Sequence, residues 1–265
     1  PTNQLLRLPL VVPVFPAIPD SGLAKLTPDA LRAAITPRTK LLVLNSPSNP
    51  SGVVYTREEY EGLAEVLRGT DICVMSDELY HRLMLGDVPH TPFASIDGMY
   101  ERTITVNGAS KTYAMTGWRL GFAGGPERII NAMSRMQGQT TSGAVSFVQT
   151  ATITALTADQ SCVDEMTKAY RARGERMWSG LNAIPGVHCE RPLGGFVCFP
   201  DVSETFERLD VTDAGGFAEV VLEQSHIALV TGVAFGSPAH VRLSFATSMQ
   251  QIEEGMDRLT RLLTA

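Results

Sequence analysis

A lysine at position 111 follows a stretch of sequence that predicts the end of a β-strand. The β-branched residues at 103–106 favour a strand, and Asn107 and Gly108 then interrupt it. Lys111 would therefore lie just past the C-terminal end of a strand, where ligands bind in open α/β sheets. A single lysine in a loop is more often a solvated surface residue. Whether Lys111 has a function therefore depends on which residues are expected near it.

Polar side chains also follow two earlier strands of the predicted sheet. Short apolar runs at residues 41–44 and 72–75 are typical of strands buried in a parallel sheet. The first run leads to a turn-rich loop containing Asn49, and the second leads to Asp77 and Tyr80. Because parallel strands end at the same edge of a sheet, we expect these side chains to lie near the lysine.

The combined residue types favour one kind of site. Beside the lysine stand Ser110 and Arg119, which are suited to holding a phosphate. A lysine, an acid and an anion clamp are what pyridoxal phosphate requires for its imine, its ring nitrogen and its phosphate. Each residue also has an ordinary alternative: Asp77 as a helix cap, Tyr80 in the core, Asn49 in a turn and Arg119 on a surface strand.

Four segments resemble a known family in the order that the family has them. The chain is similar to the fold-type I pyridoxal phosphate enzymes, specifically the class I/II aminotransferases of the aspartate aminotransferase type. The cofactor-attachment signature matches GASKTYAMTGWRLG at 108–121, and the further motifs match NSPSNPSG at 45–52, SDELY at 76–80 and VRLSFA at 241–246. The resemblance spans nearly the whole chain.

The resemblance implies three catalytic residues. Lys111 would form the internal aldimine with pyridoxal phosphate and later carry a proton between the substrate α-carbon and the cofactor carbon C4′. Asp77 would pair with the protonated pyridine nitrogen and keep the ring an electron sink. Tyr80, together with Asn49, would hydrogen-bond the phenolic oxygen of the cofactor.

The resemblance also implies residues for the phosphate and for the substrate. Ser110 and Arg119 would hold the cofactor phosphate. Arg242, in the alternating strand predicted at 241–245, would bind the α-carboxylate of the substrate beside Asn49, because a guanidinium suits bidentate capture of a carboxylate. The ordinary alternative for Arg242 is an ion-paired arginine on the surface of a sheet.

Composition excludes several classes of partner. The net charge of -6 is spread along the chain without a basic block, which argues against a nucleic-acid surface. No apolar run reaches the length of a membrane span. The four cysteines have no C-x-x-C spacing, which favours a reducing, cytoplasmic setting, and the five histidines have no metal-ligand spacing, so we expect no metal.

The elements predict an α/β protein in two parts. Strands alternate with helices up to about residue 125, which is typical of βαβ units, and helices then follow through residue 184, the last of them capped by Asp159. We expect residues 1–160 to form a cofactor-binding large domain with a mostly parallel sheet flanked by helices. Residues 161–265 would form a smaller C-terminal α+β domain, with further strands at 187–189, 196–199, 227–230 and 241–245. A strand is also predicted at 11–15.

The sequence departs from the family pattern in two places. Family members carry a longer N-terminal portion with a phosphate-binding glycine loop and an aromatic residue that stacks on the cofactor. We therefore expect this large domain to be incomplete, as a piece of a longer protein or with impaired cofactor binding. Gly108 also stands where some members have a phosphate-binding serine. Because the family's active site lies at a dimer interface, a homodimer is expected.

Three functions remain open at this point. The leading interpretation is an aminotransferase that moves an amino group between an L-amino acid and a 2-oxo acid. A carbon-sulfur lyase of the same fold would use the same anchor residues. The third interpretation is the cofactor-binding effector domain of a transcription regulator, although the chain has no basic helical segment.

Overall fold

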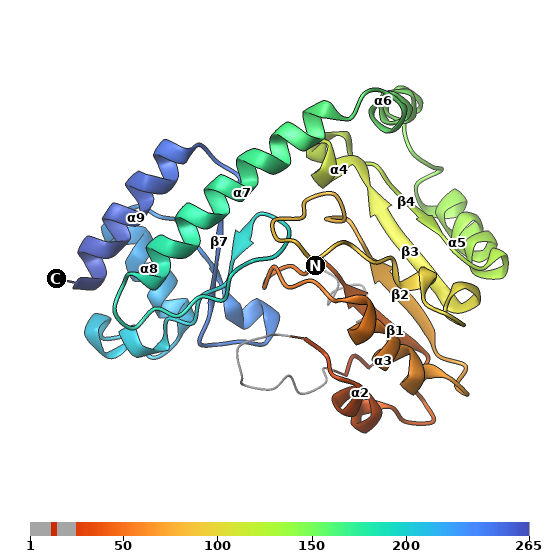
Figure 1. Ribbon diagram of the computed structural model, residues 1–265, viewed down its shortest axis with the longest axis horizontal. Helices are drawn as coiled ribbons and strands as arrows, with labels where there is room; N and C mark the ends of the chain where they lie inside the picture. The colour runs from red at the N-terminus through yellow and green to blue at the C-terminus, as the bar shows by residue number, and fades with distance from the viewer. Residues whose placement is uncertain (1–11, 15–24, 265) are drawn as a thin grey trace.

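The computed structural model describes residues 12–14 and 25–264. Within these ranges the strands form a four-stranded sheet and a three-stranded sheet, joined by a long helix (Figure 1). Of the strand predicted at 11–15, residues 12–14 are described and have no regular structure, whereas residues 11 and 15 lie outside the described residues.

The first sheet places the ends of its parallel strands side by side. Its order is β1 (Leu41–Asn45), β2 (Cys73–Asp77), β3 (Thr103–Gly108) and β4 (Gly121–Gly124). The first three strands are parallel, and β4 is antiparallel to β3. In the register, Asn45 pairs with Asp77 and Asp77 pairs with Val106, so β1 and β2 end level with one another and β3 continues to Gly108. The predicted mostly parallel sheet is confirmed.

Two helices cover one part of this sheet, and both begin as their sequences predict. Helix α2 (Pro28–Ala34) has Thr27 as its N-cap and a proline at its first position. Helix α3 (Arg57–Leu67) begins with a capping box between Thr56 and Glu59. The buried face of α3 packs into a hydrophobic cluster with β1, β2 and Phe93.

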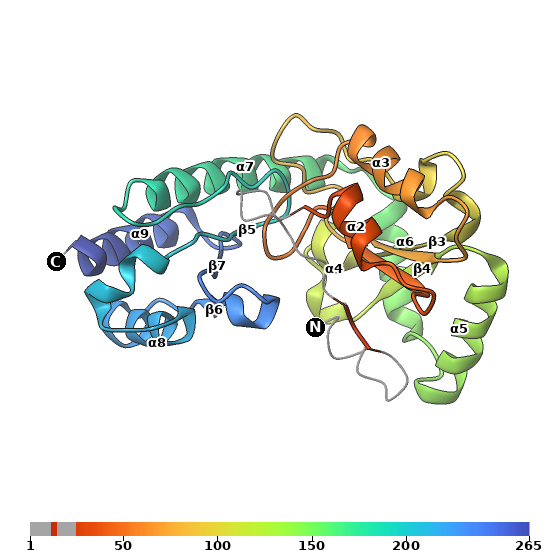
Figure 2. The same ribbon diagram turned by 90° about the horizontal axis from the view of Figure 1, so that it is seen from below.

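Helices α5 (Glu127–Thr140) and α6 (Ser146–Thr157) lie beyond β4 and are largely exposed (Figure 1). No residue of α5 is buried, and α6 buries only Val148 and Thr152. Helix α7 (Ser161–Asn182) then runs from the first sheet to the second, as both views show (Figure 2). The N-cap is Gln160, one residue after the predicted cap, and its side chain makes no capping bond, whereas Asp159 accepts the backbone N–H of Ser161 at 3.4 Å.

The second sheet is small and antiparallel. Its order is β5 (Val197–Cys198), β7 (Val241–Ser244) and β6 (Val230–Thr231), and it packs with helices α8 (Ala214–Ser225) and α9 (Met249–Thr264). The strand predicted at 187–189 is wrong, because only an isolated bridge joins His188 to Asp201 there. Val187 and Cys189 are buried in the hydrophobic cluster without a strand partner, so apolar spacing alone misled the prediction.

Single helical turns connect the longer elements. They are α4 (Ala109–Thr112) and the 3-10 turns η1 (Phe93–Ser95), η2 (Tyr100–Arg102), η3 (Thr116–Trp118), η4 (Ser203–Thr205), η5 (Glu207–Leu209) and η6 (Gly232–Phe235). Within the described ranges, no helix is both long enough and apolar enough to cross a membrane.

The buried residues form one hydrophobic cluster around each sheet. The cluster of the first sheet is built from residues between Leu31 and Met99, and the cluster of the second sheet from residues between Met177 and Leu263. The boundary predicted at residue 160 falls between these two sets and stays a prediction.

Candidate functional site

Hydrogen bonds beyond the strand ends hold the loops of the first sheet together. Asn45 donates from Nδ2 to the carbonyl of Asp77 at 3.1 Å, and Glu78 donates its backbone N–H to the carbonyl of Val106 at 2.9 Å. The Oδ1 atom of Asn45 accepts the backbone N–H of Asn49 at 2.7 Å. The loops after β1, β2 and β3 therefore leave the sheet in a fixed relation to one another.

Lys111 lies in the single turn α4, directly after β3, and is half-buried. Its Nζ atom is 6.0 Å from the ring centre of Tyr80 and 5.6 Å from that of Phe196. Those two rings pack edge to face with 5.5 Å between their centres. The amine thus lies beside two aromatic rings, which exclude water from part of its surroundings.

Asp77 ends β2 and is partly buried. Loss of hydration raises the pKa of its carboxyl, while the N–H of Leu79, at 3.2 Å from Oδ1, and the charge of Lys111 act in the opposite direction. Asp77 is not a helix cap, because a turn follows it. A partly desolvated carboxylate of this kind gains from a cationic partner.

Tyr80 presents a buried phenol between the charges of the site. Burial and the nearby Asp77 raise the pKa of Tyr80, whereas the charge of Arg242 lowers it. Asp77, which is close in sequence, and Arg242, which is far along the chain, therefore both act on Tyr80.

Arg242 joins the two sheets at the site. It lies on β7, and its Nη1 atom donates to Oδ1 of Asn49 at 2.9 Å, across 193 residues of sequence. Its guanidinium also lies 5.3 Å from the ring centre of Phe235. The structure therefore brings Arg242 and Asn49 together, as predicted for residues that share one ligand.

The segment at 193–194, before β5, is hydrogen-bonded to the loop that contains Asn49. The carbonyl of Gly52 accepts the backbone N–H groups of Leu193 and Gly194, at 2.9 and 3.0 Å. A Cβ atom on Gly194 would lie 2.5 Å from Pro47, so only glycine fits between the two segments. We did not predict Gly194 or Phe196 as site residues, although the glycine pair before a short strand indicated a close approach.

The residues predicted to bind the cofactor phosphate are not hydrogen-bonded to one another within the described part of the chain. Ser110 is half-buried in α4. Arg119 is exposed, has a left-handed backbone with φ of 55°, and donates from Nη1 to the carbonyl of Thr116 at 2.8 Å, within its own turn. Among the described residues, no hydrogen bond joins Arg119 to Ser110 or Lys111.

Gly108 has a packing reason to be glycine. A Cβ atom there would lie 3.0 Å from the carbonyl oxygen of Leu120 and 3.1 Å from Cα of Gly121. These contacts are tighter than ordinary van der Waals packing, because β3 and β4 approach closely at this point. A serine in place of Gly108 would require the two strands to move apart.

Pyridoxal phosphate can be tested against this set of side chains. Its pyridine nitrogen needs an acid, its aldehyde an amine and its phenolic oxygen hydrogen-bond partners. The partly desolvated Asp77, the half-buried Lys111, the phenol of Tyr80 and the amide of Asn49 have these chemical properties at one sheet edge. The residues present fit the ring of the cofactor, and Ser110 is available to the phosphate.

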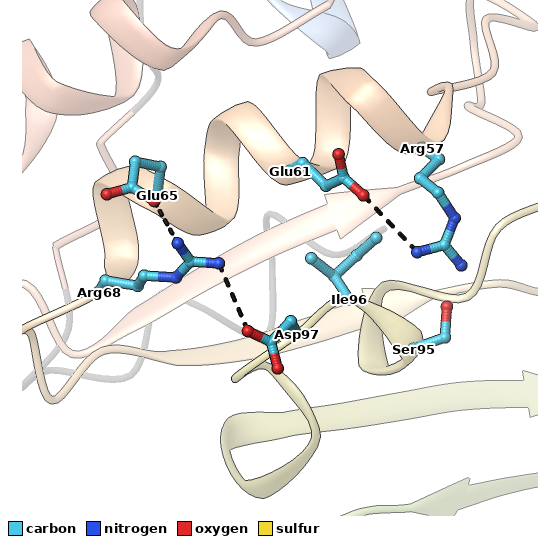
Figure 3. Close-up of a pocket in the computed structure, with 7 residues that line it drawn as sticks. All are labelled: Arg57, Glu61, Glu65, Arg68, Ser95, Ile96 and Asp97. Atoms are coloured by element: carbon cyan, nitrogen blue, oxygen red, sulfur yellow. Dashed lines mark hydrogen bonds and ion pairs between the residues drawn. The ribbon is translucent and has the colours of Figure 1, made fainter.

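Two surface hollows lie away from these residues. The first, of about 490 Å³, is lined by α3 and η1 residues, in which Arg57 pairs with Glu61 and Arg68 pairs with Glu65 and Asp97 (Figure 3). The second, of about 560 Å³, lies between α9 and residues 226–229. In the part of the chain that the structure describes, no group of three or more His, Cys, Asp or Glu side chains is arranged to hold a metal ion.

The chain is similar to known proteins over most of its length. The family model for aminotransferase class I and II matches residues 11–259. An aspartate/prephenate aminotransferase of Nitrosomonas europaea is 43% identical over 260 residues, which cover 94% of this chain and 66% of the relative. The chain therefore spans just under two thirds of that relative's length.

Solved structures are similar to both sheets together. The aspartate aminotransferase of Rhizobium meliloti superposes with a TM-score of 0.86 at 38% identity, over 91% of this chain and 62% of that one. The aromatic aminotransferase of Pyrococcus horikoshii gives a TM-score of 0.86 at 39% identity, over 91% and 64% of the two chains. The chain belongs to the class I and II aminotransferase family and has the fold-type I architecture.

Proposed function

We propose that this chain transfers an amino group between an L-amino acid and a 2-oxo acid, with pyridoxal phosphate held at Lys111. The observation that supports this most strongly is the contact of Arg242 with Asn49 at 2.9 Å, beside Lys111, Asp77 and Tyr80. An amine, a carboxylate, a phenol and a guanidinium suited to a carboxylate thus lie near one another at one edge of the sheet. When bound, the cofactor supplies an electron sink for the substrate α-carbon.

Lys111 is the proposed attachment point and proton carrier. Its free amine would move a proton from the substrate α-carbon to the cofactor carbon C4′ in the first half of the reaction, and the reverse transfer would complete the second half. The rings of Tyr80 and Phe196 beside Nζ exclude water from that side of the amine.

Asp77 and Tyr80 set the electrostatics of the site. The Asp77 carboxylate binds the protonated ring nitrogen, and this new opposite charge favours its ionised form against the burial that raises its pKa. Tyr80 donates its phenol proton in a hydrogen bond to the phenolic oxygen of the cofactor, together with the amide of Asn49. Burial raises the pKa of Tyr80, which keeps the phenol a donor at neutral pH.

Arg242 and Asn49 bind the substrate, and Ser110 and Arg119 bind the phosphate. Arg242 captures the α-carboxylate, and its bond to Asn49 orients the guanidinium before substrate arrives. To bind the phosphate, Arg119 must break its hydrogen bond to the carbonyl of Thr116 and adopt another side-chain conformation.

We infer aspartate as an amino donor from the names of the relatives in Nitrosomonas europaea and Rhizobium meliloti. The test is a profile of amino donors with 2-oxoglutarate as acceptor. Stoichiometric 2-oxo acid formation from aspartate supports the proposal. Ammonia and pyruvate released from a thioether amino acid without any acceptor would instead identify a lyase.

Lys111→Ala is the decisive variant for this function. We expect it to abolish the visible absorption of the cofactor bound as an imine and to remove all turnover, because the remaining residues offer no amine at this position. Absorption spectra and donor assays of both chains measure the effect. Turnover that survives the substitution would refute the assignment of Lys111.

A homodimer in the cytoplasm is also part of the proposal. Helices α5 and α6 expose large apolar side chains, among them Met136, Phe147 and Ile153, which suits a surface covered by a second copy. The four cysteines are free thiols, in keeping with a reducing compartment.

A further inference from the structure

A polar cluster packs against the proposed site but has no role in the reaction described above. It consists of Glu78, His81, His90 and Asn107, which come from the turn after β2, a loop and the end of β3. Asn107 lies four residues before Lys111, and His81 directly follows Tyr80. The cluster therefore connects the segments that carry two of the proposed catalytic groups.

The hydrogen bonds assign a direction to the contact between His81 and Asn107. The Oδ1 atom of Asn107 accepts the N–H of Gly108 at 2.8 Å, which orients its Nδ2 atom toward Nδ1 of His81 at 3.0 Å. Since a side-chain amide nitrogen only donates, this hydrogen bond requires that Nδ1 of His81 accepts and carries no proton. In that form the neutral ring holds its proton on Nε2.

Nδ1 of His81 has a second contact, and the two contacts suit different protonation states of this nitrogen. Nδ1 of His81 also lies 3.2 Å from the carbonyl oxygen of Glu78, which only accepts. If Nδ1 were protonated, it would donate to Glu78, and Asn107 would lose its acceptor. The bridge to β3 thus exists only while Nδ1 is unprotonated.

The surroundings of His81 favour that neutral form. Burial and the neighbouring His90 lower the pKa of His81, and Arg82 acts in the same direction, while Glu78 opposes them. The ring of His90 lies 5.8 Å from that of His81, centre to centre. His90 is fixed in turn by its Nε2 contact at 3.0 Å to the buried carboxylate of Glu78.

Glu78 directly follows Asp77, the last residue of β2, and fixes the rest of the group. Its Oε1 atom accepts the hydroxyl of Ser76 at 2.8 Å and the backbone N–H of Phe93 at 3.2 Å. These bonds attach the turn after β2 to the strand and to the loop at Phe93. His81 is the member of the cluster that reaches across to the Lys111 segment.

We propose that His81 is a positioning residue, which holds Tyr80 and Lys111 in register by accepting a hydrogen bond from Asn107. This inference rests on the proposed aminotransferase function. It requires an unprotonated acceptor at the position of Nδ1, and not merely a side chain of similar volume. Loss of the acceptor should let the two segments shift relative to each other.

Two substitutions separate the acceptor from the packing. His81→Leu removes the acceptor, whereas His81→Asn keeps an oxygen close to the position of Nδ1. We expect His81→Leu to shift the pH midpoint of the imine absorption and to lower kcat by about tenfold to a hundredfold, with a smaller change in KM. The pH midpoint and kcat of His81→Asn should lie close to those of the wild type. The exposed His188→Leu should match the wild type in both.

Each outcome decides the inference. A His81→Leu chain with an unchanged midpoint and kcat would overturn it, and so would equal impairment of the Leu and Asn variants, which would indicate packing alone. If His81→Leu does not fold, nitrogen NMR of the wild-type chain decides, because a protonated Nδ1 on His81 excludes the bridge. A wild-type chain that forms no imine with added pyridoxal phosphate refutes the proposed function instead.

Discussion

At the scale of single residues, the site contains charged side chains that contribute little to the stability of the fold but are needed for the proposed chemistry. Asp77 is partly desolvated, and its nearest opposite charge is the amine of Lys111. Arg242 is bound by the neutral amide of Asn49, which leaves its charge available to a ligand. Both arrangements become favourable when an ionic partner binds.

Replacing Asp77 should therefore stabilise the cofactor-free chain. The folded-state pKa of Asp77 is raised, so its ionised form disfavours folding above that pKa, and the effect disappears below the ordinary pKa of aspartate. We expect Asp77→Asn to raise the free energy of unfolding at pH 7 by about 0.5–2 kcal/mol. Urea unfolding at pH 7 and near pH 4 measures the difference, which should shrink at the lower pH.

The exposed Asp87→Asn serves as the matched control for this experiment and should leave stability nearly unchanged. An Asp77→Asn chain that is less stable than the wild type at pH 7 would contradict the prediction. It would mean that the bond from Leu79 and the charge of Lys111 outweigh the loss of hydration.

Arg242→Lys should weaken substrate binding more than it slows the reaction. A lysine can keep one hydrogen bond to Asn49, but it replaces the planar fork with a point charge. We expect KM for amino acids to rise by about tenfold, with a smaller change in kcat. Steady-state kinetics with several donors measure this, with the half-buried Arg258→Lys, which pairs with Glu254 on α9, as control. Unchanged KM values for all donors would make Arg242 a structural residue only.

At the scale of elements, the site depends on how closely two segments approach. Residues 192–195, before β5, lie against the loop after β1, and Gly194 touches Pro47 in that contact. The same segment precedes Phe196, whose ring faces Lys111. The position of the Asn49 loop is therefore set by the second sheet as well as by its own.

Gly194→Ala should disturb this contact measurably. The added Cβ would lie 2.5 Å from Cβ and Cγ of Pro47, which is too close for any real contact. Overpacking of this kind costs about 1–3 kcal/mol, and the shifted Asn49 loop should also raise KM. Urea unfolding and kinetics test both effects.

Gly255→Ala is the matched control for Gly194→Ala. A Cβ atom on Gly255, in the middle of α9, meets nothing within 4 Å. An alanine there should stabilise the chain by up to about 1 kcal/mol through helix propensity. A Gly194→Ala chain as stable as this control would show that the two segments separate without cost.

At the scale of the whole molecule, the exposed apolar surface is concentrated around β4, α5 and α6. Both views place these elements at the same end of the molecule, beyond β3 (Figures 1 and 2). Met136 is 69% exposed and Phe147 is 70% exposed, values that are unusual for residues of this size in helices. A surface of this kind favours association.

The double substitution Met136→Lys and Phe147→Lys should weaken the proposed homodimer. Two buried ammonium groups at a self-associating face would be desolvated and would repel their copies. We expect sedimentation velocity to show a dimer for the wild-type chain and a monomer for the double variant. Tyr100, which is 73% exposed on η2, offers the control Tyr100→Lys. A wild-type chain that sediments as a monomer would contradict the homodimer.

Much of the fold could be predicted because its signals are local. The strands before Asn49, Asp77 and Lys111 were predicted from short apolar or β-branched runs. The strand predicted at 187–189 failed because apolar residues at 187 and 189 are also what a buried loop requires. Strand pairing is decided by partners far along the chain, which a short window of sequence does not contain.

The sequence by itself determined the family, the fold class and the order of the side chains proposed for the site, because residue type and spacing encode them directly. The contacts of Arg242 with Asn49, of Phe196 with Lys111 and of His81 with Asn107 are visible in the tertiary structure alone. It also left Arg119 folded onto its own turn. Such contacts depend on how β-sheets and loops pack across long separations, and Lys111 acquires its surroundings from that packing.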